Sequence, residues 1–288
     1  DLLNPSDWIK NEQPVFEGSA ADGIYSPGHN SFFKSPDGKQ DWILYHANDQ
    51  PGLGCGGARS PRAQSFSWKA DGSPDFGKPI ACSIAQAQQP NPPGQVSGSE
   101  KPVHEAYLFA HMTHKDYGRL YYSVSLDGLH WKLLNDGRRV FEDYKGHPDI
   151  CKGHDGRYYI VGNTSDGSPD INFWVSDDLI QWTKYSTYTP DLKKTPGYAH
   201  ALQRIGAPKL YYDTDSSRYI LTWHTPHLNG TKEDPERYWA SQRTLYVQSK
   251  DLKTFSAYPT KLFQWDMGTI DVFLRKIAGN YYAIIKDE

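Results

Sequence analysis

Apolar and polar residues alternate in short runs along most of the chain, and turn-forming residues separate these runs. Residues 149–162 show the pattern clearly. An apolar run follows Asp149, an Asp-Gly turn comes at 155–156, and a run of aromatic and β-branched residues ends the segment. Such runs joined by an Asp-Gly turn are typical of a β-hairpin. The sequence therefore predicts a hairpin whose first strand begins at a carboxylate.

The same outline recurs three more times, which indicates a repeated unit. The further hairpins are expected at residues 29–46, 207–223 and 271–285, and they begin at His29, Ala207 and Asp271.

A second phrase accompanies the hairpins: an apolar strand, a Ser-Asp turn, and an aromatic ring that opens the next strand. Copies are expected at residues 120–131, 172–182 and 244–255, with a looser copy at 62–68. Ser and Asp suit such a turn because their side chains bond to the nearby backbone. A hairpin followed by this phrase is the four-stranded unit of a β-propeller blade, for which repeats of about 40–50 residues are expected.

We therefore predict an all-β protein that forms a single five-bladed β-propeller domain over residues 1–288. Blades are expected to start near residues 29, 107, 149, 207 and 271. Two unrelated β-sandwiches are the alternative, which the constant order of the two phrases disfavours.

The two ends of the chain each hold part of a blade. Residues 271–288 supply only two strands, and residues 1–16 have the pattern of a last strand. An unpaired blade edge invites pairing with other chains, so we expect the N-terminal strand and the C-terminal hairpin to share one blade. Residues 86–103 are rich in Pro and Gln, which predicts a linker between two blades.

Composition agrees with an all-β class, since 14% of residues are aromatic and Gly and Pro are plentiful. The net charge of −3 gives no reason to expect a nucleic-acid partner, and no apolar stretch is long enough to cross a membrane. The N-terminus lacks the pattern of a signal peptide. Cys55, Cys82 and Cys151 have no metal-ligand spacing, and their odd number leaves at least one thiol free.

With these motifs the chain resembles glycoside hydrolase family 43, the five-bladed propeller glycosidases of arabinofuranosidase and arabinanase type. Residues 1–80 resemble the C-terminal end of a family member, and residues 106–288 resemble its N-terminal two-thirds. The most specific phrases lie at 1–5, 28–33, 41–46, 58–64, 107–109, 125–131, 147–150 and 269–272. The swapped order implies a circularly permuted or chimeric propeller, or a junction between tandem domains. The length of the chain favours a permuted propeller.

The resemblance implies an inverting hydrolase. In such an enzyme a general base activates water and a general acid protonates the leaving oxygen, with the two carboxyl groups roughly 6.5–9.5 Å apart. Asp149 matches the general base. Asp271 matches the carboxylate that orients the acid and raises its pKa. The alternatives are structural: Asp149 would cap a hairpin and Asp271 would enter a strand.

His29 matches the histidine that family members hold near the propeller axis, where it binds a water or a metal such as Ca²⁺. A core histidine is the alternative. No cofactor is expected to be required. Because Ca²⁺ prefers oxygen ligands, any ion at His29 would be held mostly by water.

The general acid is the serious departure from the family pattern. Family members carry it as the Glu of a Glu-Gly-Pro or Glu-Ala-Pro phrase, and this sequence contains neither phrase. Glu17 and Glu288 are the acids near the join of the two chain ends, and both fit poorly. Loss of acid assistance should slow cleavage of ordinary glycosides by roughly 10²–10⁴-fold.

Two functions of different classes follow from the resemblance. The first is a glycosidase acting on arabinose-containing oligosaccharides or polysaccharides of plant cell walls, of α-L-arabinofuranosidase or β-xylosidase type. The second is a carbohydrate-binding propeller that lost the acid. A propeller scaffold without sugar chemistry is a third. In either of the first two cases we expect a monomer that is secreted or periplasmic.

Overall fold

The structure is a computed structural model that describes residues 2–35, 37–54, 58–81, 106–163, 168–198, 204–227, 234–277 and 279–287. These residues form five antiparallel sheets, and consecutive strands are neighbours in each. The chain divides into two compact units. Unit 1 comprises Asp1–Ile9, Ala110–Tyr122 and Asn135–Glu288, and unit 2 comprises Lys10–Phe109 and Ser123–Leu134. The all-β class is confirmed. No helix in the described ranges is long and apolar enough to span a membrane.

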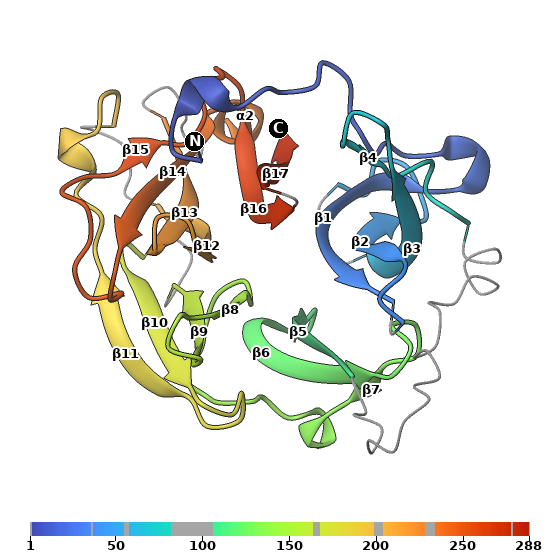
Figure 1. Ribbon diagram of the computed structural model, residues 1–288, viewed down its shortest axis with the longest axis horizontal. Coiled ribbons are helices and arrows are strands. Elements are labelled where there is room, and N and C mark those ends of the chain that lie inside the picture. Colours follow the sequence, from blue (N-terminus) through green and yellow to red (C-terminus); the bar gives the residue numbers. More distant parts are fainter. Residues whose placement is uncertain are drawn as a thin grey trace. The chain divides into compact units, whose positions relative to one another are not determined.

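The strands of each sheet follow one another along the chain (Figure 1). The first sheet holds β1 (Tyr25–Lys34), β2 (Asp41–Asn48), β3 (Ser60–Trp68) and β4 (Pro74–Asp75), and the second holds β5 (Tyr107–Thr113), β6 (Asp116–Ser125) and β7 (Lys132–Leu133). The third holds β8 (Ile150–Lys152), β9 (Tyr158–Gly162), β10 (Ile171–Ser176) and β11 (Thr183–Tyr188). The fourth holds β12 (Gly206–Asp213), β13 (Arg218–Pro226), β14 (Gln242–Ser249) and β15 (Thr260–Lys261), and the fifth holds β16 (Thr269–Ile277) and β17 (Asn280–Asp287). The helical segments are 3₁₀ turns at Pro5–Asp7, Ala20–Asp22, Asn135–Gly137 and Leu192–Lys194, and α2 (Pro235–Ala240).

Within unit 1 the last three sheets pack against one another as consecutive blades do. The first strand of the fourth sheet, β12, contacts β8 and β9 of the third sheet and β16 of the fifth (Figure 1). One hydrophobic core lies between the third and fourth sheets, where Phe173 meets Trp223 and Leu245. A second core lies between the fourth and fifth sheets and includes Ile220 and Val272. This stacking of meander sheets through their faces is the β-propeller arrangement.

The four expected hairpins are confirmed. They are the antiparallel pairs β1–β2, β8–β9, β12–β13 and β16–β17. In the Asp-Gly turn of the third sheet, Asp155 accepts a bond from the backbone N–H of Arg157, and Gly156 has a φ of 81°. A positive φ of this size is inexpensive only for glycine, which explains the residue type at that position.

The Ser-Asp turns are confirmed as well, and the same bonds form in each. After β14, Asp251 accepts the backbone N–H groups of Lys253 and Thr254 at 2.9 and 2.8 Å, while the Ser249 hydroxyl accepts the N–H of Asp251. Asp127 and Asp178 make the equivalent bonds after β6 and β10. These backbone donors hold the pKa of Asp251 down, at about 2.

The expected last strand at residues 1–16 is wrong. The described residues 2–18 contain no strand, only the 3₁₀ turn at Pro5–Asp7, which begins at the Asn4 cap. Pro5 and Pro14 carry no backbone N–H and suit a strand poorly. Leu2 is nevertheless buried, at 3% exposed, in the core of the C-terminal hairpin, and Leu3 and Trp8 pack against that core, whereas Ile9 is exposed. The N-terminal segment therefore packs on that sheet without pairing with it.

The expected linker at 86–103 lies outside the described residues, as do Cys55 and Cys82. The number of blades in a closed ring and the permuted order stay predictions.

Candidate active site

Three first strands share one local distortion. His29, Ala207 and Asp271 have φ angles of 48°, 38° and 53°, in the left-handed region. Each lies where the strand register shifts: between Gly28 and Ser31, between Gly206 and Lys209, and between Ile270 and Phe273. In each case two residues of the first strand face one residue of the next strand, which is a β-bulge. Because a bulge redirects side chains, the repeat sets the direction in which Asp271 points.

Asp149 lies at no such bulge. It directly precedes the short first strand of its sheet, β8. Its Oδ2 accepts the backbone N–H of Leu210, in β12, at 3.2 Å. Among the described residues, the partner of the half-buried Asp149 carboxylate is thus a backbone N–H of the neighbouring sheet, which holds the carboxylate in place.

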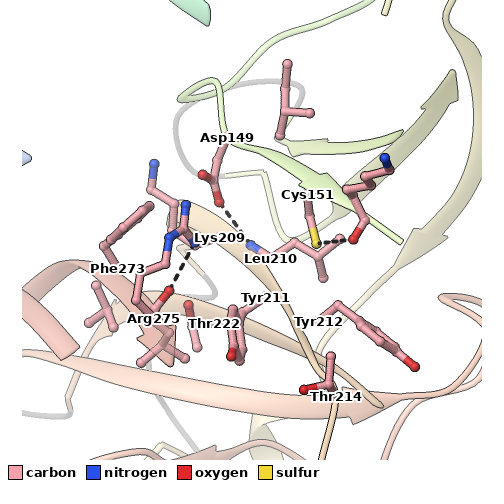
Figure 2. A pocket seen from close by; sticks show the side chains of 14 residues that line it. Asp149, Cys151, Lys209, Leu210, Tyr211, Tyr212, Thr214, Thr222, Phe273 and Arg275 are labelled. Carbon is pink, nitrogen blue, oxygen red and sulfur yellow. Dashed lines mark hydrogen bonds between the residues drawn. The ribbon is translucent and has the colours of Figure 1, made fainter. Parts of the chain in front are cut away.

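Asp149 lies at a pocket of about 410 Å³ whose walls come from β8, β12 and β16 (Figure 2). The lining residues are Asp149, Ile150, Cys151, Lys152, Lys209, Leu210, Tyr211, Tyr212, Thr214, Thr222, Val272, Phe273, Leu274 and Arg275. A volume in this range suits a small-molecule ligand, and the mixture of aromatic rings with a few charged groups is typical of such sites.

Asp271 borders a narrow gap between side chains, together with Ala207, His224 and Thr244, and this second cavity is too tight to hold a water molecule. Thr222 and Val272 line both this second cavity and the larger pocket. Asp149 and Asp271 therefore share two neighbours in unit 1, although 122 positions separate them in the sequence.

His29 lies in unit 2 and is exposed, so it is not a core histidine. Its ring centroid is 5.4 Å from that of His46, whose Nε2 is hydrogen-bonded to the Arg59 guanidinium. Imidazoles next to a guanidinium are a poor set for Ca²⁺, which prefers oxygen ligands. The described residues contain no group of three or more His, Cys, Asp or Glu side chains arranged to hold a metal.

Neither weak candidate for the general acid is placed at these cavities. Glu17 is exposed and belongs to unit 2, and Glu288 lies outside the described residues. Among the residues that the structure describes, no glutamate lines either cavity.

The sequence reasoning missed the three cations of the pocket, Lys152, Lys209 and Arg275. Lys209 is only 8% exposed, and Arg275 stacks on the Phe273 ring with its guanidinium carbon 4.1 Å from the ring centroid. The sequence did contain a signal for Lys209, which is a charged residue inside an otherwise apolar strand. The sequence alone could not show that its side chain faces the pocket, because this depends on the bulge at Ala207.

Cys151 also lines the pocket but is not a nucleophile. Burial, with a further contribution from the Asp149 carboxylate, raises the pKa of its thiol to about 12. The thiol therefore stays protonated at neutral pH, and only the thiolate is reactive.

Comparison with known proteins shows which families and relatives the chain is similar to. The chain is 46% identical over 85 residues to an extracellular exo-α-(1→5)-L-arabinofuranosidase of Streptomyces avermitilis, and the match covers 28% of the chain and 18% of the relative. It is 38% identical over 84 residues to α-L-arabinofuranosidase 43 of Humicola insolens, with the same two coverages. The matched part thus spans less than a fifth of either relative's length.

Among solved structures, a fructofuranosidase from Schwanniomyces occidentalis complexed with fructosylnystose covers 87% of this chain, and the match covers 49% of that protein. The TM-score is 0.50 at 12% identity, which indicates a shared fold only.

Two family descriptions match consecutive parts of the sequence. Residues 1–74 match glycosyl hydrolases family 43. Residues 102–288, well over half of the chain, match the family described as a probable glycosyl hydrolase domain. The chain therefore belongs to this family of glycosyl hydrolase domains, with a first segment that is similar to family 43 itself.

Proposed function

We propose that the chain is an inverting glycoside hydrolase of α-L-arabinofuranosidase type, acting on arabinose-containing plant cell-wall oligosaccharides or polysaccharides. The observation that supports the proposal is that Asp149 lines the pocket of unit 1, while Asp271 lies beside Thr222 and Val272, which line the same pocket. The names of the two curated relatives support arabinose as the sugar.

Asp149 is the proposed general base. One carboxylate oxygen accepts the Leu210 N–H, which holds the group in place and leaves Oδ1 to accept a proton from water. The attacking water would lie between Asp149 and the anomeric carbon, on the side opposite the leaving oxygen, so that the configuration inverts.

Asp271 is the proposed positioning carboxylate. Asp271 has a left-handed backbone and lies beside Thr244 and His224. A carboxylate there would orient the general acid and, as a like charge, favour the protonated form of that acid.

The alternative is a propeller that binds carbohydrate but hydrolyses it poorly. The missing Glu-Gly-Pro or Glu-Ala-Pro phrase favours this alternative. An aryl glycoside separates the two functions, because 4-nitrophenolate leaves without much help from an acid.

The test is release of 4-nitrophenol from 4-nitrophenyl α-L-arabinofuranoside by the chain and by Asp149→Asn. Loss of the base should lower kcat by roughly 10²–10⁴-fold. Asp177→Asn is the matched control, since Asp177 is exposed and has no hydrogen bond or ion pair with the other described residues. The first product seen by NMR should have the inverted anomeric configuration. Binding of arabino-oligosaccharides without any aryl cleavage would favour the alternative, and retention of configuration would refute the mechanism.

Several further properties belong to the same proposal. We propose one permuted five-bladed propeller over the whole chain, for which analytical ultracentrifugation should show a compact monomer. Secretion is supported by the name of the Streptomyces relative, which is extracellular. The reaction should need no cofactor, so treatment with EDTA should leave the rate unchanged.

A further inference from the structure

The pocket between β8, β12 and β16 carries more positive than negative charge. Lys209 and Arg275 line it from β12 and β16 (Figure 2), and the exposed Lys152 is a further lining residue. Asp149 is the carboxylate among the lining residues. The proposed hydrolysis uses Asp149 and leaves these cations without a role.

Lys209 is the more informative of the two cations because it is nine-tenths buried. Its residue exposure is 8%, and among the described residues no carboxylate oxygen lies within 4.0 Å of its ammonium group. The stem of Lys209 is buried, but its nitrogen is not among the buried side-chain nitrogens that lack a partner, so the ammonium group reaches the open pocket. Together with Lys152 and Arg275 it gives the pocket three positive groups against the carboxylate of Asp149, and this excess favours an anionic ligand.

Arg275 is held in position but keeps donors free for a ligand. Its guanidinium stacks on Phe273, and Nη1 donates to the Leu274 carbonyl at 3.2 Å. No ion pair to a described carboxylate uses the remaining N–H groups. The planar guanidinium can bind two oxygens of one ligand, and Lys209 can add a point charge.

We propose that this pocket binds an oxyanion through Lys209 and Arg275. The ligand would present a planar or tetrahedral group of negatively charged oxygens. Two ligands have such a group: a sugar acid, through its carboxylate, and free inorganic phosphate. Thr222, the cross-strand partner of Lys209, adds a hydroxyl donor to the same wall. Asp149, which also lines the pocket, can accept hydroxyl hydrogens from the ligand and repels a second anion, so the anionic group should bind nearest the two cations.

The test is isothermal titration calorimetry on the full chain at constant ionic strength, with sodium glucuronate, inorganic phosphate and neutral glucose as separate titrants. Lys209→Met and Arg275→Met each remove one charge and keep an apolar stem. Each should weaken oxyanion binding by at least about tenfold, which corresponds to one charge-assisted hydrogen bond. Lys209→Arg should retain binding to within about threefold.

Lys250→Met is the matched control. Lys250 is exposed in the turn after β14 and makes no contact with the other described residues, so its loss changes the net charge equally. Thermal unfolding of each variant checks the fold. If Lys209→Met does not fold, Arg275→Met carries the test, since Arg275 is exposed in the pocket.

Tighter binding of glucuronate than of phosphate would identify a sugar acid as the source, and the reverse would identify a free anion; both support the site. Absence of binding by both anions would overturn the proposal, and so would equal weakening in Lys250→Met. The measurement is independent of the proposed hydrolysis, because it needs no turnover of an arabinoside.

Discussion

Substitution of Asp271 by Asn separates the proposed chemical role of this residue from its structural one. Asp271 has a φ of 53° at the bulge of β16, a conformation that Asn and Asp adopt more readily than other residues with a side chain. Asp271→Asn therefore removes the negative charge and keeps a residue that suits the backbone. Asp271→Ala removes the charge and places an ordinary side chain in the left-handed region.

The two variants should differ in stability. An ordinary L-residue in the left-handed region costs roughly 1–2 kcal/mol, of which Asp recovers part, so we expect Asp271→Ala to lose about 1 kcal/mol. For a chain of this size that corresponds to a decrease in Tm of about 2–4 °C. Asp271→Asn should unfold within about 1 °C of the unsubstituted protein. Circular dichroism during heating measures both values.

The two substrates should differ in rate. If Asp271 acts through the general acid, the Asn variant should lose about 10²-fold or more on an α-(1→5)-linked arabino-oligosaccharide. On the 4-nitrophenyl arabinoside the loss should be at least about tenfold smaller, because the leaving group needs little protonation. Asp149→Asn should affect both substrates alike, since water must be activated in either case.

Equal losses on both substrates for Asp271→Asn would refute the assignment of Asp271 to the acid. Unchanged rates on both substrates, at an unchanged Tm, would refute any role of its charge. A Tm for Asp271→Asn as low as that of Asp271→Ala would contradict the account of the bulge.

Three further predictions concern the stability of unit 1. Asp251→Asn should lower Tm at pH 6, with Lys250→Ala as an unaffected control. Since the pKa of Asp251 is lowered to about 2 in the folded chain, its contribution is complete above about pH 4 and disappears as the pH falls through 2, so the Tm difference should vanish there. Tyr281→Phe should cost about 1–2 kcal/mol in urea unfolding because Tyr281 donates to the buried Asp213 carboxylate at 2.6 Å. Ala207→Gly should raise the free energy of unfolding by about 0.5–1 kcal/mol, and so raise the urea midpoint, because glycine relieves the φ of 38° at some cost in entropy; an unchanged or lower midpoint would contradict this.

The repeats were predictable because their information is local. The Ser-Asp turn needs only Ser249, Asp251 and the next backbone N–H groups, all within a few positions of each other. The same holds for the Asp-Gly turn at Asp155 and for the apolar runs of the hairpins. Such patterns are set by short-range hydrogen bonding and side-chain alternation, so one copy can be recognised from another.

The pocket was only partly predictable because its lining depends on register. Asp149 was found as a carboxylate at the start of a strand. Lys209 faces the pocket because the bulge at Ala207 shifts the register of β12 against β13, and a shift by one residue exchanges the two faces of a strand. Nothing in the alternation of polar and apolar residues marks that shift, so the cations could not be placed from the sequence.

The first nine residues match one family description but pack with the part of the chain that matches the other. They fall in the segment that is similar to family 43, yet within unit 1 they pack on the last sheet, which is formed by the second segment. Leu2 is buried with Val272 and Leu274, and the Gln264 amide donates to the Ser6 hydroxyl at 2.9 Å. Full burial of one leucine is worth about 1.5–3 kcal/mol. If the two segments were parts of separate tandem domains, the first segment would not be expected to fill the core of the second. Since the N-terminal residues fill that core without forming a strand, burial of apolar side chains, rather than pairing of the sheet edge, associates the two ends of the chain. This packing within unit 1 supports the proposal of one permuted fold.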